Sequence, residues 1–318
     1  MSHGPRGAVV ALAGGVGAAR LLRGLVRAVP AADVTAIVNT GDDAEFYGVH
    51  VSPDLDIVTY TLAGAVDTQK GYGLAGDSTT VVDQLGALGH EVWFRLGDRD
   101  LAHSLHRTLR PRAGAGLAEI ADELRRHLGV ATRILPMSED PCPTLVELSG
   151  GHTVHFEEYL ARDGAPDDVQ GVDLSAAQRA RPAPGVIEAI RSAGVIVVCP
   201  SNPVVSIGPV LAIPGIRDAI AASSAPVVAV SPIVGGAPIK GPADRLLRGI
   251  GVEVSAKGVA GLYTGLAGGF VFDERDAEQA AAIEDLGLRT RVVDTVMVDL
   301  AASTRLAEAA LELADELR

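Results

Sequence analysis

The stretch AGGVGAARLLRGL (Ala13–Leu25) joins a short apolar run, Ala8–Leu12, to a segment with helical periodicity. Glycines between a strand and a helix let the backbone approach a phosphate group closely. Gly14, Gly15 and Gly17 do not follow the spacing G-x-G-x-x-G, and no Lys-Ser or Lys-Thr pair comes after them. The stretch is therefore neither a dinucleotide fingerprint nor a P-loop. It predicts a phosphate-binding loop or, alternatively, a tight strand-to-helix turn in a chain with 37 glycines.

Short apolar runs alternate with helical patterns along the rest of the chain. We predict strands at Val9–Leu12, Val34–Val38, Val92–Leu96, Arg133–Leu135, Val195–Cys199 and Val227–Val230. We predict helices at Ala18–Ala28, Ser78–Leu88, Leu101–Leu109, Leu117–Leu128, Val186–Ser192, Ile216–Ala222 and Ala243–Ile250, and a long C-terminal helix capped by Asp299. Several runs are continuously apolar, as strands buried on both faces of a parallel sheet are. The alternation predicts an α/β fold, a doubly wound, Rossmann-like parallel sheet with helices on both faces.

The middle of the chain departs from this alternation. Gly150 and Gly151 separate two β-like runs in TLVELSGGHTVHFEEYL, which is a hairpin signal. Hydrophobic residues make up 47% of the chain, which is enough for one large core. We therefore expect a single domain over residues 1–318 with a smaller inserted α+β subdomain at about residues 98–182.

The charge balance limits the possible partners. The net charge of −13 argues against nucleic acid, whose phosphates would repel an acidic surface. No apolar run reaches the length of a membrane span, and we interpret the opening stretch Met1–Gly15 as mature structure and not as a signal peptide. Cys142 and Cys199 form neither a zinc motif nor a disulfide framework, which favours a reducing, cytoplasmic location.

Four aspartates follow the predicted strand Val34–Val38 within 15 residues: Asp42, Asp43, Asp54 and Asp56. The carboxyl ends of parallel strands form the edge where ligands bind, and carboxylates at that edge commonly hold magnesium against a diphosphate. Alternatively, Asp43 and Asp56 are caps and turn formers, and Asp54 only starts a helix. We favour a magnesium site for the cluster as a whole.

A further loop, Gly97-Asp98-Arg99, follows the predicted strand Val92–Leu96 and opens a helix. Arg99 carries a planar cation that suits a phosphate or a planar ring. On spacing alone, however, a helix cap formed by Asp98 together with a local Arg–Asp pair is the favoured interpretation.

Two polar loops follow the later predicted strands. The first, CPSNPVVSIG, carries Ser201, Asn202, Ser206 and Gly208 between prolines, so it can present hydroxyls, an amide and backbone N–H groups to a nucleotide. The second, SPIVGGAPIKG, carries Lys240, which is one of only three lysines in the chain. We predict that Lys240 contacts a phosphate, although a surface lysine is the alternative.

Together these loops resemble the CofD/FbiA family, which makes the deazaflavin redox coenzyme F-420. The resemblance runs from residue 9 to about residue 253 and is carried by AGGVGAARLLRGL, NTGDDAEFYGVHVSPDLDIVTYTLAG, LGDRDLA, PSNPVVSIGPVLAIPGIR and SPIVGGAPIKGPADRLLRGIGVE. It implies a transferase whose donor is a guanylylated three-carbon acid, either lactyl-diphosphoguanosine or its enolpyruvyl form. Such an enzyme passes the phosphorylated acid to the ribityl hydroxyl of the deazaflavin Fo and releases GMP.

The resemblance also implies roles for the residues of these loops. The guanylyl part would be framed by Gly14, Gly15, Gly17, Ser201, Asn202, Ser206, Gly208 and Lys240. The acceptor would face Gly97, Asp98 and Arg99. Magnesium would be held by Asp42, Asp54 and Asp56, one of which would also accept the hydroxyl proton. A homodimer is expected from the resemblance as well.

Two other functions remain as alternatives. YvcK-like proteins, which are nucleotide-sugar-binding regulators, share the Gly-rich start, but their Asp loop tends to run into Gly-Gly-Ser-Ser, unlike GDDAEFYGVHVSPDLD here. A dinucleotide-dependent oxidoreductase would need an acidic residue for the ribose where Asn39 and Thr40 stand. One segment, PMSEDPCPTLVELSGG, fits the family only loosely, because Leu145 stands where a basic residue or histidine is expected. The sequence leaves the lactyl and enolpyruvyl donors open, although a high-GC composition bias leans toward the enolpyruvyl form.

Overall fold

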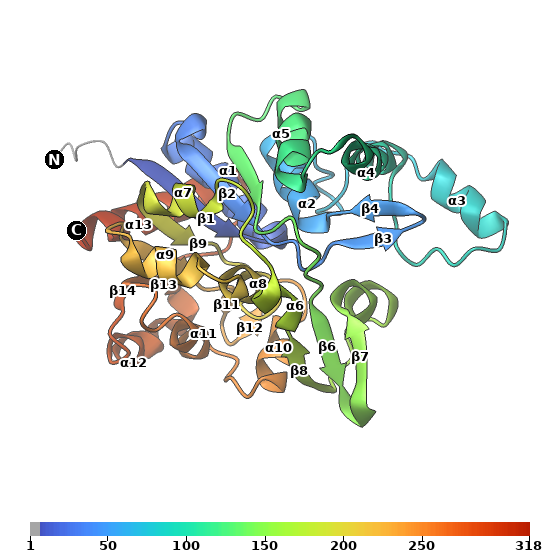
Figure 1. Ribbon diagram of the computed structural model, residues 1–318. Helices are drawn as coiled ribbons and strands as arrows, with labels where there is room; N and C mark the ends of the chain where they lie inside the picture. Colours follow the sequence, from blue (N-terminus) through green and yellow to red (C-terminus); the bar gives the residue numbers. More distant parts are fainter. Residues whose placement is uncertain (1–6) are drawn as a thin grey trace.

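A seven-stranded parallel sheet forms the centre of the computed structural model, which describes residues 7–318 (Figure 1). The strand order is β14-β13-β10-β9-β1-β2-β5, and every neighbouring pair is parallel. The strands are β1 (Ala8–Ala13), β2 (Val34–Val38), β5 (Arg133–Pro136), β9 (Ala193–Val198), β10 (Val227–Val230), β13 (Gly269–Asp273) and β14 (Arg289–Val293). The predicted α/β class and doubly wound sheet are confirmed, while residues 1–6 of the opening stretch lie outside the described residues.

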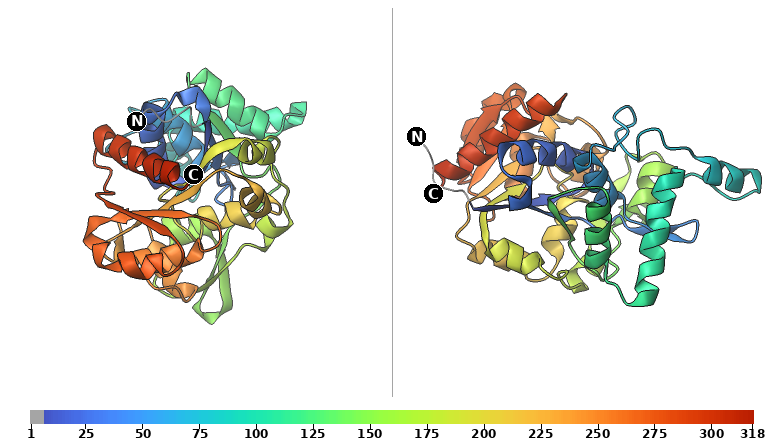
Figure 2. Two further views of the ribbon diagram at one scale, coloured as in Figure 1. Left: turned by 90° about the vertical axis from the view of Figure 1, so that its left-hand side faces the viewer. Right: turned by 90° about the horizontal axis from the view of Figure 1, so that it is seen from above.

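Helices cover both faces of the sheet (Figure 2). One face is covered by α1 (Gly15–Ala28), α2 (Pro53–Leu62) and α13 (Leu300–Glu316). The other is covered by α7 (Val186–Arg191), α8 (Ile207–Ala212), α9 (Ile216–Ala222), α10 (Ala243–Gly249), α11 (Ala256–Leu262) and α12 (Ala280–Glu284). Side chains alternate along each strand, so in β1 Val9 and Ala11 face α1 and α13, whereas Val10 and Leu12 face the opposite layer. Gly24 lets α1 approach α13 closely, because a Cβ there would lie 2.0 Å from the Ser303 carbonyl oxygen.

The connections reverse direction at β1, which pairs with β2 on one side and with β9 on the other. The chain winds outward from β1 through β2 to β5, and from β9 through β10 and β13 to β14. Such a reversal opens a crevice at the carboxyl ends of the two strands, where ligands of this fold bind. The loops that follow β1, β2 and β9 therefore meet at one place.

Smaller elements extend from the sheet. One lobe holds the hairpin of β3 (Ala44–Phe46) and β4 (Val49–Val51) together with α3 (Thr80–Ala87), α4 (Asp98–Leu109) and α5 (Leu117–His127). A second holds the antiparallel strands β6 (Leu145–Leu148), β7 (His152–His155) and β8 (Val169–Asp173), followed by α6 (Ser175–Arg179). The remaining elements are β11 (Ile233–Val234), β12 (Ala237–Pro238) and the short turns η1 (Ala31–Asp33), η2 (Arg110–Ala113), η3 (Ser149–Gly151), η4 (Glu158–Arg162) and η5 (Glu274–Gln279).

The predicted inserted subdomain at about residues 98–182 is not a single unit. Its central strand, β5, pairs with β2 in the main sheet, so the segment divides into a helical part before β5 and a β part after it. The hairpin predicted at Gly150 and Gly151 is present, and both glycines have positive φ angles of 80° and 79°. Only that β part corresponds to the expected hairpin subdomain.

The predicted strand Val92–Leu96 is wrong. Its apolar side chains form a cluster under the β3–β4 hairpin, where the Phe94 ring stacks on Phe46 at 3.9 Å between centroids and Trp93 packs edge-on against Phe46 at 5.3 Å. The run is therefore held by aromatic packing without strand pairing: Leu96 is buried, and Val92, Trp93 and Phe94 are half-buried. The prediction also omitted β13 and β14, which complete one side of the sheet.

The predicted helices are all present, with ends that differ by at most three residues. The Asp299 cap of the C-terminal helix is confirmed, because the Ala302 N–H donates to Asp299 Oδ1 at 2.7 Å. In the described part of the chain, no helix has both the length and the apolar character that crossing a membrane requires.

Candidate active site

The glycine loop between β1 and α1 packs directly against the loop between β9 and α8. Ser201 Oγ donates to the Gly14 carbonyl at 2.7 Å. A Cβ at Gly17 would lie 2.2 Å from the Pro200 carbonyl oxygen, and one at Gly14 would lie 2.7 Å from Ser206 Cβ. Side chains at these two glycines would push the loops apart. The structure thus brings together two of the loops that the sequence predicted, and it gives the glycines a packing role.

Asn39, at the end of β2, connects three segments of this site. Its Nδ2 donates to Asp54 Oδ2 at 2.9 Å and to the Val205 carbonyl at 3.3 Å. Its Oδ1 accepts from the Gly41 N–H at 2.8 Å. Asn39 is fully buried, so these bonds fix the position of Asp54 relative to both loops. In the sequence, Asn39 served only as evidence against a dinucleotide site; an amide directly after an apolar strand was the missed signal.

Asp42, Asp54 and Glu157 form a buried acidic cluster beside these loops. Burial, reinforced by the charges of Asp54 and Glu157, raises the pKa of Asp42 well above its usual range. Burial also raises the pKa of Asp54 to about 7, although hydrogen bonds from Asn39 and from the Gly15 backbone oppose the shift. The pKa of Glu157 rises to about 8 because the group is buried and faces Asp54 and Asp43. No cationic side chain in residues 7–318 forms an ion pair with any of these three carboxylates.

Glu157 was not identified from the sequence. It follows β7 and reaches the cluster because β6 and β7 extend from the segment that holds Thr144 against the Asp42 loop. The Thr144 N–H donates to the Gly41 carbonyl at 2.7 Å, and the Phe156 N–H donates to the Thr144 carbonyl at 3.0 Å. Glu157 is more than one hundred residues from Asp42 in the chain, and the only local signal was the paired Glu157-Glu158 after a β-like run.

Several buried polar atoms of the site lack a hydrogen-bond partner among the described residues. They include Asp42 Oδ1, Asp43 Oδ1 and Thr144 Oγ1. Magnesium prefers oxygen ligands and is usually held by one or two carboxylates together with water and substrate phosphates. The unpartnered oxygens and the mutual repulsion of Asp42 and Asp54 fit such an ion. Among residues 7–318, no group of three or more His, Cys, Asp or Glu side chains is arranged to hold a metal.

The other two aspartates of the predicted metal cluster have protein partners. Asp43 Oδ2 accepts from Ser52 Oγ at 2.7 Å and lies 3.0 Å from His50 Nε2. Asp56 forms a two-pronged ion pair with the buried Arg107, at 2.5 Å and 3.2 Å. A structural role is thus the better description of Asp56, because both of its oxygens accept from Arg107. Asp43 differs, because only its Oδ2 meets protein partners and its Oδ1 has none among the described residues.

The Gly97-Asp98-Arg99 segment forms helix caps. Asp98 accepts from the backbone N–H groups of Val81 at 3.0 Å and Thr80 at 3.2 Å, at the start of α3. Asp77 accepts in turn from the Arg99 N–H at 3.0 Å, and the Arg99 side chain pairs with Asp77 at 3.4 Å. The favoured interpretation holds in kind and differs in its partners. Asp98 caps α3 and not α4, the helix that this segment opens, and Arg99 pairs with Asp77, which stands 22 residues earlier in the chain. An additional role of Gly97, Asp98 and Arg99 toward the acceptor stays a prediction.

Lys240 lies close enough to Arg20 of α1, the helix that begins at the glycine loop, to feel its charge. Its Nζ lies 5.9 Å from the centre of the Tyr72 ring and donates to the Lys70 carbonyl at 3.5 Å. Burial, with a smaller effect from the Arg20 charge, lowers the pKa of Lys240. Neither cation forms an ion pair within the described residues. Two unpaired cations beside the helix favour a bound anion.

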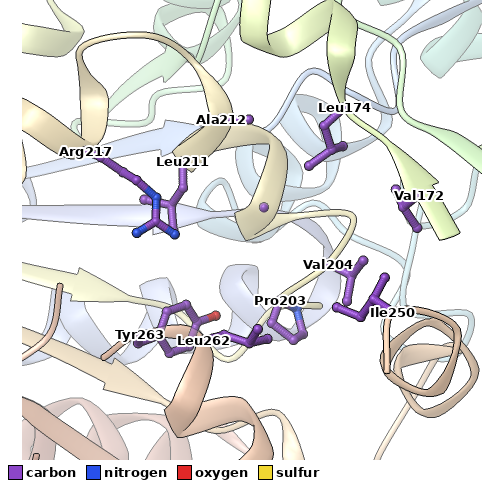
Figure 3. Close-up of a pocket in the computed structure, with 11 residues that line it drawn as sticks. Val172, Leu174, Pro203, Val204, Leu211, Ala212, Arg217, Ile250, Leu262 and Tyr263 are labelled. Atoms are coloured by element: carbon purple, nitrogen blue, oxygen red, sulfur yellow. The ribbon is translucent and has the colours of Figure 1, made fainter. Parts of the chain in front are cut away.

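The β9–α8 loop also lines a cavity of about 300 Å³ whose lining residues do not include Asp42, Asp54 or Glu157 (Figure 3). Its walls are mostly apolar, and Arg217 is the one charged residue among them. Gly208 belongs to this wall, while Asn202 Oδ1 accepts from the Val204 and Val205 N–H groups and shapes the loop. A diphosphate needs more polar partners than this cavity offers, so the acidic cluster is the better candidate site.

Comparison with known proteins identifies the family of this chain. The family described as 2-phospho-L-lactate transferase CofD matches residues 9–312. A phosphoenolpyruvate transferase from Streptomyces griseus is 46% identical, covering 98% of this chain and 99% of that protein. A 2-phospho-L-lactate transferase from Methanosarcina acetivorans is 38% identical, covering 96% and 99%. The crystal structure of a UPF0052-family protein from Bacillus halodurans shares the fold, with a TM-score of 0.65, 20% identity and coverage of 97% of this chain and 100% of that one. The chain belongs to the CofD family of transferases, which act on small-molecule substrates.

Proposed function

We propose that this transferase moves a phosphorylated three-carbon acid from its guanosine diphosphate conjugate to the ribityl hydroxyl of the deazaflavin Fo. The observation that carries the proposal is the pair of buried, unpaired carboxylates, Asp42 and Asp54, at the crevice beside a glycine loop. An acidic site of this kind can bind a diphosphate only together with cations. Arg20 on α1, and Lys240 within reach of its charge, supply fixed positive charge.

The proposed transfer makes one bond and breaks another. The acceptor oxygen attacks the phosphorus that bears the organic acid, a new P–O bond forms, and the bond from that phosphorus to the bridging oxygen of GMP breaks. GMP leaves with the bridging oxygen. The hydroxyl proton passes to a carboxylate of the cluster, and Glu157 suits this role because its pKa of about 8 lies near neutral pH.

Asp42 and Asp54 would hold magnesium, and the unpartnered Thr144 hydroxyl, which lies against Gly41, would be a further oxygen ligand. When bound, the ion would neutralise negative charge on the diphosphate as the leaving group departs. Asp56 is not part of this set, because Arg107 already engages both of its oxygens.

The enolpyruvyl conjugate is our proposed donor. It is supported by the relatives named phosphoenolpyruvate transferase, which reach 46% identity, whereas those named 2-phospho-L-lactate transferase reach 38%. The test is to incubate the protein with Fo, magnesium and each of the two guanylylated acids, and to measure GMP together with the mass of the deazaflavin product. GMP release that requires Fo would support the transfer, and faster turnover of the enolpyruvyl conjugate would support the donor. Absence of GMP with both donors would refute the proposal.

A further inference from the structure

Arg107 is a charged side chain buried inside the molecule, with 1% of its surface exposed. It lies in α4, about fifty residues after the aspartates of the site. Its guanidinium contacts two elements at once, the first turn of α2 and the strand β4. A buried arginine with partners on separate elements is placed to hold those elements in one arrangement.

The first contact fixes α2. Arg107 donates to both carboxylate oxygens of Asp56, at 2.5 Å and 3.2 Å. Asp54 precedes Asp56 by two residues in the same helical turn, and residues two apart in a helix point to different sides. Asp54 faces Asn39 and the glycine loop, while Asp56 faces Arg107. The ion pair therefore holds α2 on a different side from Asp54 and fixes the position of Asp54.

The second contact fixes β4. Arg107 Nη1 donates to the His50 carbonyl at 3.3 Å, and the His50 N–H donates to the hydroxyl of the adjacent Thr108 at 2.7 Å. The His50 ring and the Ser52 hydroxyl both hold Asp43, the neighbour of Asp42. The same region of α4 therefore holds the segment that carries Asp43.

We propose that Arg107 is the positioning residue that sets the separation of Asp42 and Asp54, and thereby the affinity of the site for a divalent cation. The proposal rests on the proposed function, because it takes those two carboxylates as the cation site. Arg107 itself touches no substrate in this scheme; it acts through Asp56 and through the His50 carbonyl.

The test compares three variants with the wild-type protein: Arg107→Lys, Arg107→Met and the double variant Asp56→Leu/Arg107→Met. Lysine keeps the charge but cannot reach both oxygens and the carbonyl in one geometry. The single methionine variant leaves Asp56 buried and unpaired, whereas the double variant removes both charges and should recover thermal stability. We expect Mn²⁺, measured by the loss of its free electron paramagnetic resonance signal, to bind at least about fivefold more weakly to Arg107→Lys and to the double variant. We also expect the fold decrease in kcat to exceed the fold change in the KM of the donor, because the substitutions leave the guanylyl-binding loops untouched.

The matched control is Arg110→Lys. Arg110 lies three residues further along the chain and pairs with Glu123 of α5 at 2.6 Å, and its side chain makes no hydrogen bond to α2 or β4 among the described residues. It should alter stability without altering Mn²⁺ affinity. A double variant that binds Mn²⁺ as tightly as the wild type, or an Arg107→Lys variant no weaker than Arg110→Lys, would overturn the proposal.

Hydrogen exchange in the metal-free protein separates this inference from the proposed function. Positioning predicts faster exchange over residues 39–56 in Arg107→Lys than in Arg110→Lys. Unchanged exchange there would overturn the inference whether or not a cation binds. If the wild-type protein binds no Mn²⁺, the cation site of the proposed function fails, and exchange still decides whether Arg107 positions these segments.

Discussion

In the absence of a divalent cation, the protein should lose stability as the pH rises from mildly acidic to mildly basic values. The folded-state pKa of Asp54 is raised from 3.8 to about 7, and that of Glu157 from 4.5 to about 8. Both groups therefore hold protons in the folded protein that the unfolded chain has already released. Stability falls wherever the folded state binds more protons than the unfolded state, so the loss should develop across this range and level off above about pH 8.

The size of the loss follows from the two shifts. One pKa unit corresponds to about 1.4 kcal/mol. Between about pH 5.5 and pH 8, the linkage relation gives a loss of about 2 kcal/mol for Asp54 and about 3 kcal/mol for Glu157 if each titrates alone. Because the two carboxyls repel each other, they titrate as a coupled pair and their separate losses do not simply add. We expect a total loss of stability of about 2–4 kcal/mol. A change of that size should lower Tm by about 3–6 °C.

Differential scanning calorimetry at the two pH values, with a chelator and then with excess magnesium, measures this effect. Magnesium should restore most of the lost stability at pH 8, because it binds the ionised carboxylates. The Asp54→Asn variant should lose much of the pH effect and respond weakly to magnesium. Asp163→Asn, at an exposed carboxyl paired with Arg162, should behave like the wild type. The reasoning is refuted if the wild-type protein with chelator is as stable at pH 8 as at pH 5.5. It is also refuted if Asp54→Asn keeps the full difference in stability between the two pH values.

Three further predictions concern individual residues and ligands. Asp42→Asn should lower kcat about 100-fold or more at saturating magnesium while Tm is retained, and near-normal turnover would remove Asp42 from the site. GDP should bind with magnesium and NAD should not, as measured by calorimetry; tight NAD binding without GDP binding would instead support an oxidoreductase. Lys240→Ala should raise the KM of the guanylylated donor more than that of Fo, because the lysine ammonium suits a phosphate. Arg99→Ala should instead raise the KM of Fo far more than that of the donor. Steady-state kinetics with one substrate varied at a time would contradict this division if both variants affected the same substrate.

Local sequence patterns predicted most of the sheet and its helices. Val9–Leu12 and Val227–Val230 are continuously apolar, as strands between two helical layers must be, and both are central strands. The glycines after β1 also marked a loop that packs closely against another predicted loop, because a turn that admits close backbone approach has a compositional signature. The pattern misassigned Val92–Leu96, since an apolar run does not reveal whether it pairs with a strand or packs against Phe46.

The different roles of the acidic residues are set by contacts between distant parts of the chain. The sequence by itself predicted a carboxylate cluster at a strand edge, with Asp42, Asp54 and Asp56 as equals. The tertiary structure brings Arg107 to Asp56 and Glu157 to Asp54. Asp56 is therefore neutralised by a cation, whereas Asp54 faces a second carboxylate that repels it. The physical reason is that a carboxylate's role depends on its burial and on the charge it faces. Those partners stand about fifty and one hundred residues away, where no local period or spacing records them.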